Sequence, residues 1–201
     1  MKLCLQDIGL QVSDLSNMHS YSIRKMYVLM RGEFQKVQWR KIICNNPGSP
    51  KWIFILRLAA LRRLHTKDRL LQGDVVDEQQ CELCNKENET IEHLFFSCDY
   101  SSEIWSRLLQ WQGINRVAMN WKDELNWACT YANGNGQTTT IFRMTFAAAV
   151  YQVWIERNQK IFQAKLCEPK MVVRRTVQDI FYRRSLKKKL ARRLNSLNFY
   201  P

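Results

Sequence analysis

The feature that most constrains this chain is a short segment rich in metal-binding side chains, CELCNKENETIEHLFFSC, over residues 81–98. It holds three of the seven cysteines and one of the three histidines, spaced as C-x2-C, eight residues, His, four residues, Cys. Thiolate and imidazole are the ligands that Zn2+ prefers, and a sequence-local zinc site usually begins with C-x2-C. We therefore predict that Cys81, Cys84, His93 and Cys98 bind one Zn2+. The alternative is that buried cysteines and an exposed histidine lie together by chance.

The spacing also sets geometric requirements. A C-x2-C turn often needs a left-handed residue after the second cysteine, and Asn85 adopts that conformation more readily than most non-glycine residues. His93 and Cys98 are five residues apart, so in a continuous α-helix their side chains would diverge by about 140°. We expect the helix that carries His93 to end or distort before Cys98. Four protein ligands would fill the coordination shell, which indicates a structural site without an open position for water.

The rest of the chain predicts a mainly α-helical fold, with minor or no β-structure limited to a hairpin near residues 81–85. Apolar residues recur at helical spacing in several segments. Helices are expected at residues 21–32, 51–64, 67–72, 99–111 and 121–131, from about 138 to 165, and after 169. The second of these is apolar almost all round and reads as a core helix with one positive edge. We expect side-chain caps from Thr66, from Asp99 or Ser101, and from Thr138 or Thr139.

Composition breaks divide the chain into four predicted parts. Residues 1–50 form an N-terminal helical segment and a linker that ends in NNPGSP, where the prolines interrupt helix. Residues 51–115 form the zinc-binding domain, and residues 116–168 a helical extension. Residues 169–201 form a basic amphipathic C-terminal helix. Its two apolar stripes cannot face one surface, so we expect a bend near residues 183–185.

The charge is unevenly placed along the chain. The net charge is +13; from Lys165 onward eleven Lys or Arg stand against two acids, giving +9 and leaving only +4 for residues 1–164. A basic tail on a nearly balanced body favours a polyanionic partner, nucleic acid above all. The alternative is a solvated helix face. An odd number of cysteines without a secretion signal favours an intracellular, reducing location, and the basic cluster favours the nucleus.

A wider pattern resembles a known family. The stretch RLHTKDRLLQGDVVDEQQCELCNKENETIEHLFFSCDYSSEIW resembles the zinc-binding region that follows the reverse transcriptase in plant LINE-type retrotransposon polyproteins. The matching positions are Thr66, Asp68, Arg69, Leu70, Cys81, Cys84, Glu89, Thr90, Glu92, His93, Leu94, Phe95, Phe96, Cys98, Ile104 and Trp105. A looser likeness extends over residues 21–162. The family often has Pro after the first cysteine and Gly after the second, where this chain has Glu82 and Asn85. The resemblance implies a fragment of such an element, or a host gene derived from one, without polymerase or endonuclease.

These observations leave two main functions open. The first is a zinc-stabilised nucleic-acid-binding module for RNA or DNA, with a reverse transcriptase supplied in trans as a further partner. The predicted nucleic-acid contacts are Arg57, Arg62, Arg63, Lys67, Arg183, Arg184, Lys187, Lys188, Lys189, Arg192 and Arg193. Phe95, Phe96 and Trp105 either stack on bases or belong to the core. The second function is a structural or protein-interaction domain in which zinc only stabilises the fold, and a decayed reading frame is a third alternative. No catalytic constellation, small-molecule substrate or membrane span is expected.

Overall fold

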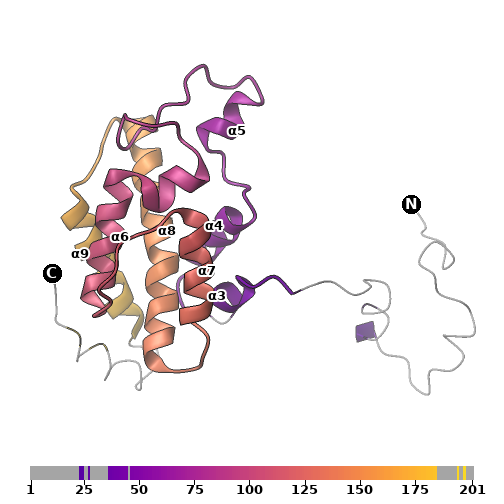
Figure 1. The fold of residues 1–201 in the computed structure, drawn as a ribbon, viewed down its shortest axis with the longest axis vertical. Helices are drawn as coiled ribbons and strands as arrows, with labels where there is room; N and C mark the ends of the chain where they lie inside the picture. The colour runs from indigo at the N-terminus through magenta and orange to yellow at the C-terminus, as the bar shows by residue number, and fades with distance from the viewer. Residues whose placement is uncertain are drawn as a thin grey trace, which may run out of the picture. The chain divides into compact units, whose positions relative to one another are not determined.

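The computed structural model describes residues 36–44 and 46–184, together with the single positions 23, 24, 27, 194 and 197. The contacts within the chain divide it into two units, Met1–Val37 and Gln38–Pro201. Every element discussed below lies in the second unit. Figure 1 shows helices α3 (Arg40–Cys44), α4 (Pro50–Ala60), α5 (Lys67–Leu71), α6 (Asp99–Trp111), α7 (Trp121–Tyr131), α8 (Gln137–Gln163) and α9 (Pro169–Arg184). A π-helical turn, His93–Ser97, precedes α6. The prediction of a mainly α-helical fold is confirmed.

β-Structure is minimal in the described residues. One isolated antiparallel bridge joins Gln80 to Asn88, on either side of the turn where a minor hairpin was expected. The four-part division of the chain stays a prediction, because the contacts between elements do not test it. Within the described residues, no helix has the length and apolar character that crossing a membrane requires.

The central element is α8, whose residues 141–150 are all buried. A helix that is apolar on every face must be covered on every face, as the sequence predicted for this segment. Helix α4 packs against it, and α6 and α9 pack against it and against each other (Figure 1). Helix α9 contributes Val172, Val173, Val177 and Ile180 to this core. The predicted bend at residues 183–185 falls at the limit of the described residues and is not tested.

An aromatic cluster connects the zinc-binding segment to the core. Phe96 lies 5.3 Å from Trp105, 5.8 Å from Trp121 and 5.5 Å from Phe146, measured between ring centroids. These rings come from the π turn, α6, α7 and α8, so four elements meet at one point. Phe95, Phe96 and Trp105 are at most 2% exposed. Of the two interpretations of these residues, the core is therefore correct, and stacking on bases is wrong.

The prediction that residues 51–64 form a core helix needs correction. Helix α4 begins with Pro50, as the break predicted, and it buries Trp52, Leu56 and Ala59. It is not buried all round, because Phe54 remains 59% exposed on the opposite face. An apolar sequence shows that a helix tolerates burial, but the number of neighbouring elements decides how many of its faces are covered.

The predicted side-chain caps are also wrong. Thr66 occupies the predicted N-cap position of α5 but makes no side-chain capping bond; instead the Lys67 amide donates to Glu89 Oε1 at 3.0 Å. The N-cap position of α6 is Cys98, and that of α8 is Gly136. The Thr139 hydroxyl donates to the Gly136 carbonyl oxygen at 2.9 Å rather than accepting from an amide. A distant carboxylate can replace a local cap, and sequence proximity does not reveal that.

Candidate metal centre

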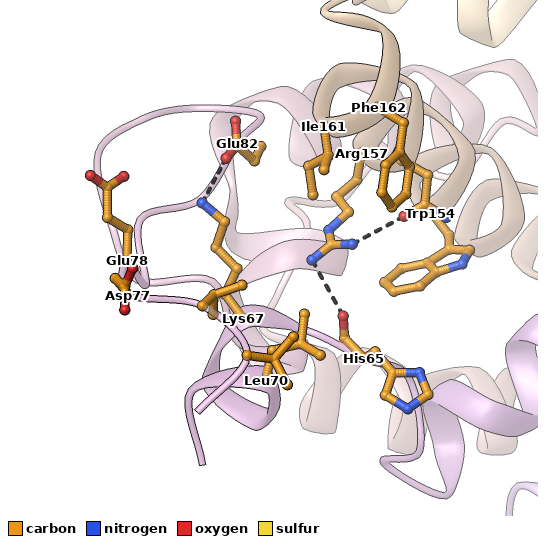
Figure 2. Close-up of a pocket in the computed structure, with 13 residues that line it drawn as sticks. His65, Lys67, Leu70, Asp77, Glu78, Glu82, Trp154, Arg157, Ile161 and Phe162 are labelled. Carbon is orange, nitrogen blue, oxygen red and sulfur yellow. Dashed lines mark hydrogen bonds and ion pairs between the residues drawn. The ribbon is translucent and has the colours of Figure 1, made fainter. Parts of the chain in front are cut away.

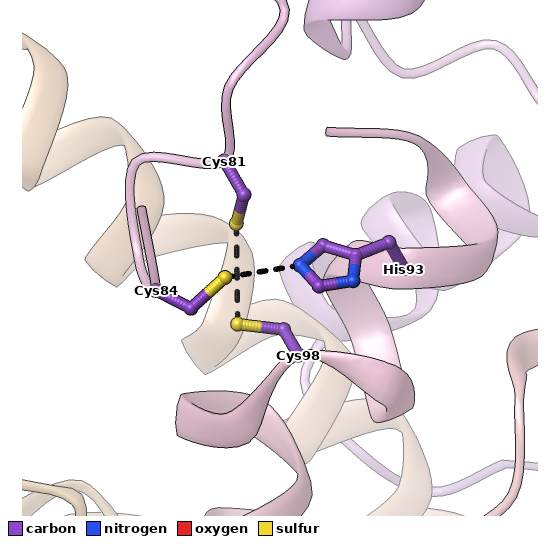
Figure 3. A group of neighbouring side chains, drawn as sticks. All are labelled: Cys81, Cys84, His93 and Cys98. Carbon is purple, nitrogen blue, oxygen red and sulfur yellow. Dashed lines mark hydrogen bonds between the residues drawn. The ribbon is translucent and has the colours of Figure 1, made fainter. Parts of the chain in front are cut away.

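The four predicted ligands converge on one point, as Figure 3 shows. Their ligand atoms, three sulfurs and one ring nitrogen, all lie within 4.8 Å of one another. The Cys81 and Cys98 sulfurs are 3.9 Å apart, and Cys84 Sγ lies 3.2 Å from His93 Nε2. Sulfurs bound tetrahedrally to zinc at about 2.3 Å stand about 3.8 Å apart. The donor set and its spacing therefore fit Zn2+, and the cluster could hold it with all four positions filled by protein.

The first two cysteines lie in a tight turn. The Asn85 amide donates to the Cys81 carbonyl oxygen at 2.8 Å, and Asn85 has a φ of 54°. This left-handed conformation is the one the sequence predicted for the position. The Cys81 amide donates to the Glu87 carbonyl oxygen at 2.8 Å, which closes the turn from the other side. The turn directs both sulfurs toward the same space.

The last two ligands depend on a π-helical turn. The Cys98 amide donates to the His93 carbonyl oxygen at 2.8 Å, which is a bond from residue i+5 to residue i. This bond widens the helical turn, so residues five apart lie closer to one face than they would in an α-helix. Cys98 is then extended, with φ −64° and ψ 134°, before α6 begins. The predicted distortion between His93 and Cys98 is confirmed.

The imidazole has a carboxylate on its far side. His93 is 6% exposed, and its Nδ1 lies 3.1 Å from Glu87 Oε2. The two atoms are close enough for a hydrogen bond, although the ring nitrogen lacks the alignment for one. Metal-binding histidines commonly donate their second ring N–H to a carboxylate, which holds the ring in place. Nε2 faces the cysteine sulfurs and Nδ1 faces Glu87, so the ring is oriented for ligation through Nε2.

The buried thiols influence each other's ionisation. The neighbouring Cys98 thiol lowers the pKa of Cys81 to about 5. The same contact, followed by burial, raises the pKa of Cys98. A lowered pKa favours the thiolate of Cys81, which is the form of cysteine that binds metal.

A buried ion pair anchors this segment to α8. Arg157 Nη2 lies 2.7 Å from Glu89 Oε1, and the two side chains are 4% and 0% exposed. Arg157 Nη2 also donates to the His65 carbonyl oxygen at 3.3 Å. Glu89 therefore holds both the start of α5 and the central helix. Glu89 is one of the positions that match the family pattern, but its pairing with Arg157 was not predicted, because 68 positions separate the two residues.

The predicted nucleic-acid contacts are found in different environments. Arg57 and Arg63 are exposed and form no ion pair with the described residues. Arg62 is also exposed but pairs with Glu92. Lys67 is only 8% exposed and its Nζ lies 2.6 Å from Glu82 Oε1, so it is not presented to solvent. Arg183 lies over the Trp52 ring at 5.4 Å. The Arg184 side chain and the residues Lys187, Lys188, Lys189, Arg192 and Arg193 lie outside the described residues.

A helical domain organised around a buried cluster of three cysteines and one histidine belongs to the class of metal-stabilised domains. Residues 21–105 match the family model described as zinc-binding in reverse transcriptase. This part of the chain is similar to that family, and it contains all four cluster residues. The resemblance is confirmed there, while the plant LINE origin stays an expectation. Comparison with curated proteins and with solved structures finds no match.

Proposed function

We propose that Cys81, Cys84, His93 and Cys98 bind one Zn2+, and that the domain so stabilised binds nucleic acid. The convergence of four ligand atoms within 4.8 Å supports the metal assignment. Cysteine and histidine side chains gathered in this way, with no further protein ligand needed, suit a structural zinc ion. When bound, the ion would hold the turn, the π turn and the start of α6 together. Its binding free energy would thereby contribute to folding.

The nucleic-acid proposal rests on charge. Helix α4 contains no acidic residue, and Arg57 on it and Arg63 just after it stay exposed without an acidic partner among the described residues. The segment from Lys165 onward adds a net charge of +9. Cations without local partners attract phosphate, because binding releases the counterions condensed on the nucleic acid. RNA or DNA is the ligand class, a reverse transcriptase acting in trans is a further proposed partner, and a nuclear location would suit both.

The test is the salt dependence of binding to a fluorescent single-stranded RNA and to a duplex DNA. Each phosphate contact contributes roughly 0.7–0.9 to the slope of log affinity against log salt concentration. Replacing Arg57 and Arg63 by Gln should reduce the slope by about one to two units. The control Arg107→Gln, whose native guanidinium pairs with Glu103 at 2.9 Å, should leave it unchanged. Equal slopes in the parent and the double variant would show that this face does not bind nucleic acid.

The second candidate function is a protein-interaction domain in which zinc only stabilises the fold. The observation in its favour is that two of the predicted contacts, Arg62 and Lys67, already pair with Glu92 and Glu82. An affinity for the RNA and DNA probes that does not change with salt concentration would support this alternative, since an apolar interface depends little on ionic strength. The parent protein showing no affinity for either nucleic acid at low salt would have the same meaning.

A further inference from the structure

An open groove lies beside the zinc-binding segment, between the loop of residues 72–82 and the C-terminal part of α8 (Figure 2). Its volume is about 760 Å³. One wall comes from α8, with Trp154, Ile161 and Phe162; the other comes from α5 and the loop that follows it, with Leu70 and Val75. The size is within the range of about 300–1,000 Å³ typical of ligand pockets.

The groove exposes apolar side chains that a surface normally covers. Phe162 is 78% exposed and Val75 is 67% exposed, and both line the groove. A large aliphatic or aromatic side chain that stays in water loses the free energy that burial would contribute. Single exposed apolar residues are common, but several that face one concavity mark an interaction site. These side chains therefore favour a ligand that is itself partly apolar.

The charges around the groove favour a basic ligand. Its two buried cations are already neutralised, because Lys67 pairs with Glu82 and Arg157 pairs with Glu89. Asp77 and Glu78, by contrast, line the groove and form no ion pair with any described residue. The groove thus has a net negative edge on a chain whose net charge is +13. Such an edge repels phosphate and attracts lysine or arginine.

We infer that this groove docks a segment of a partner protein that carries apolar side chains next to lysine or arginine. An apolar side chain of the segment lies between Val75 and Phe162, and a neighbouring cation faces Asp77 and Glu78. Nucleic acid is excluded as the occupant by the sign of the charge. The inference does not depend on the proposed nucleic-acid function, because Arg57 and Arg63 take no part in the groove.

The probe is a terminally blocked octapeptide, LKKLLKKL, titrated into the zinc-loaded full chain with isotope-labelled methyl groups. Binding should shift the methyl resonances of Val75, Val76 and Ile161. The matched peptide LEELLEEL should bind at least about tenfold more weakly, because like charges oppose it at the edge. Equal binding of the two peptides, shifts confined to other parts of the protein, or no binding of either would overturn the inference.

Two variants locate the contact. Phe162→Ser should weaken binding of LKKLLKKL by about tenfold or more, since an aromatic anchor dominates a small interface. The control Phe54→Ser removes a similarly exposed aromatic, 59% exposed on α4, and should leave the affinity unchanged. Both variants should keep the zinc content and far-ultraviolet circular dichroism of the parent, which excludes misfolding. Equal affinities in the two variants, or displacement of the peptide by single-stranded RNA, would contradict a peptide groove. Loss of RNA binding with peptide binding intact would affect only the proposed nucleic-acid function.

Discussion

At the scale of single residues, the cluster depends on side chains that hold the ligands as well as on the ligands themselves. Glu87 is the clearest case, since its Oε2 lies 3.1 Å from His93 Nδ1 while its own side chain is 72% exposed. An exposed carboxylate can move by a few tenths of an ångström to accept the ring N–H. It would then keep Nε2 directed at the metal and raise its basicity.

Glu87→Gln should therefore weaken zinc binding while leaving the ligands in place. Loss of a carboxylate that supports a metal-binding histidine typically costs about 10–100-fold in affinity, and the exposure of Glu87 favours the lower end. The measurement is competition with a chromophoric zinc chelator. The control is Glu78→Gln, which changes an acid that does not contact the cluster. Identical affinities for both variants and the parent would show that Glu87 does not support His93.

Asn85 offers a second test at this scale. Its φ of 54° strains any residue with a branched side chain, whereas glycine adopts it without cost. Asn85→Gly should leave the free energy of unfolding nearly unchanged, and Asn85→Val should lower it by about 1–2 kcal/mol. Urea denaturation at fixed zinc concentration measures both. An equally small effect of both substitutions would mean that the turn does not require a left-handed residue.

At the scale of elements, the zinc-binding segment and α8 are joined by the Glu89–Arg157 pair. The pair is buried and bidentate, since Arg157 Nη2 donates to Glu89 Oε1 at 2.7 Å and Nε donates to Oε2 at 3.2 Å. Removing one partner of such a pair leaves a charge in a medium that solvates it poorly. The pair therefore couples the folding of the metal site to that of the central helix.

Arg157→Ala should destabilise the protein by about 3–5 kcal/mol, because Glu89 would remain buried and unpaired. The control Arg174→Ala changes an exposed arginine of α9 and should cost well under 1 kcal/mol. The double variant Glu89→Gln with Arg157→Met should recover part of the loss, since neither residue would then be charged. Chemical denaturation of the four proteins tests this. A double variant no more stable than Arg157→Ala would show that the two residues are not coupled.

Some features of these elements could be predicted from the sequence, and others could not. Local requirements were predictable: the left-handed Asn85 and the distortion before Cys98 follow from the spacing of four ligands. The caps were not, because the amide of Lys67 is satisfied by Glu89, 22 positions away. The exposure of Phe54 was also missed, since it depends on which elements fail to cover α4. Conformations that depend on a few adjacent residues can be predicted from the sequence. Hydrogen bonds and burial that depend on a distant residue require knowledge of the fold.

At the scale of the whole molecule, exposed positive and negative charges lie at different places. The exposed arginines Arg57 and Arg63 lie on α4 and just after it, whereas the acidic loop and its apolar neighbours form the groove beside α8. The C-terminal cluster Lys187, Lys188, Lys189, Arg192 and Arg193 adds five charges within seven residues. A chain organised in this way can hold a polyanion and a basic protein segment at different places.

Replacing the five basic residues of the C-terminal cluster by Gln tests its role in binding. The slope of log affinity against log salt should flatten by up to about 3.5–4.5 units, according to the number of phosphates contacted. Zinc content should not change, because the cluster contains no metal ligand. Nucleic-acid affinity equal to that of the parent at every salt concentration would reduce the tail to a structural role.

Zinc binding by the four side chains is tested most directly by the zinc content of the purified protein, measured by mass spectrometry. The parent should carry one zinc per chain. Cys81→Ser should carry none and should lose helical signal and thermal stability, because metal binding and folding are coupled. Cys129→Ser, which changes another buried thiol outside the cluster, should keep its zinc. A stable, helical parent without zinc, or a Cys81→Ser variant with the full zinc content, would contradict the account.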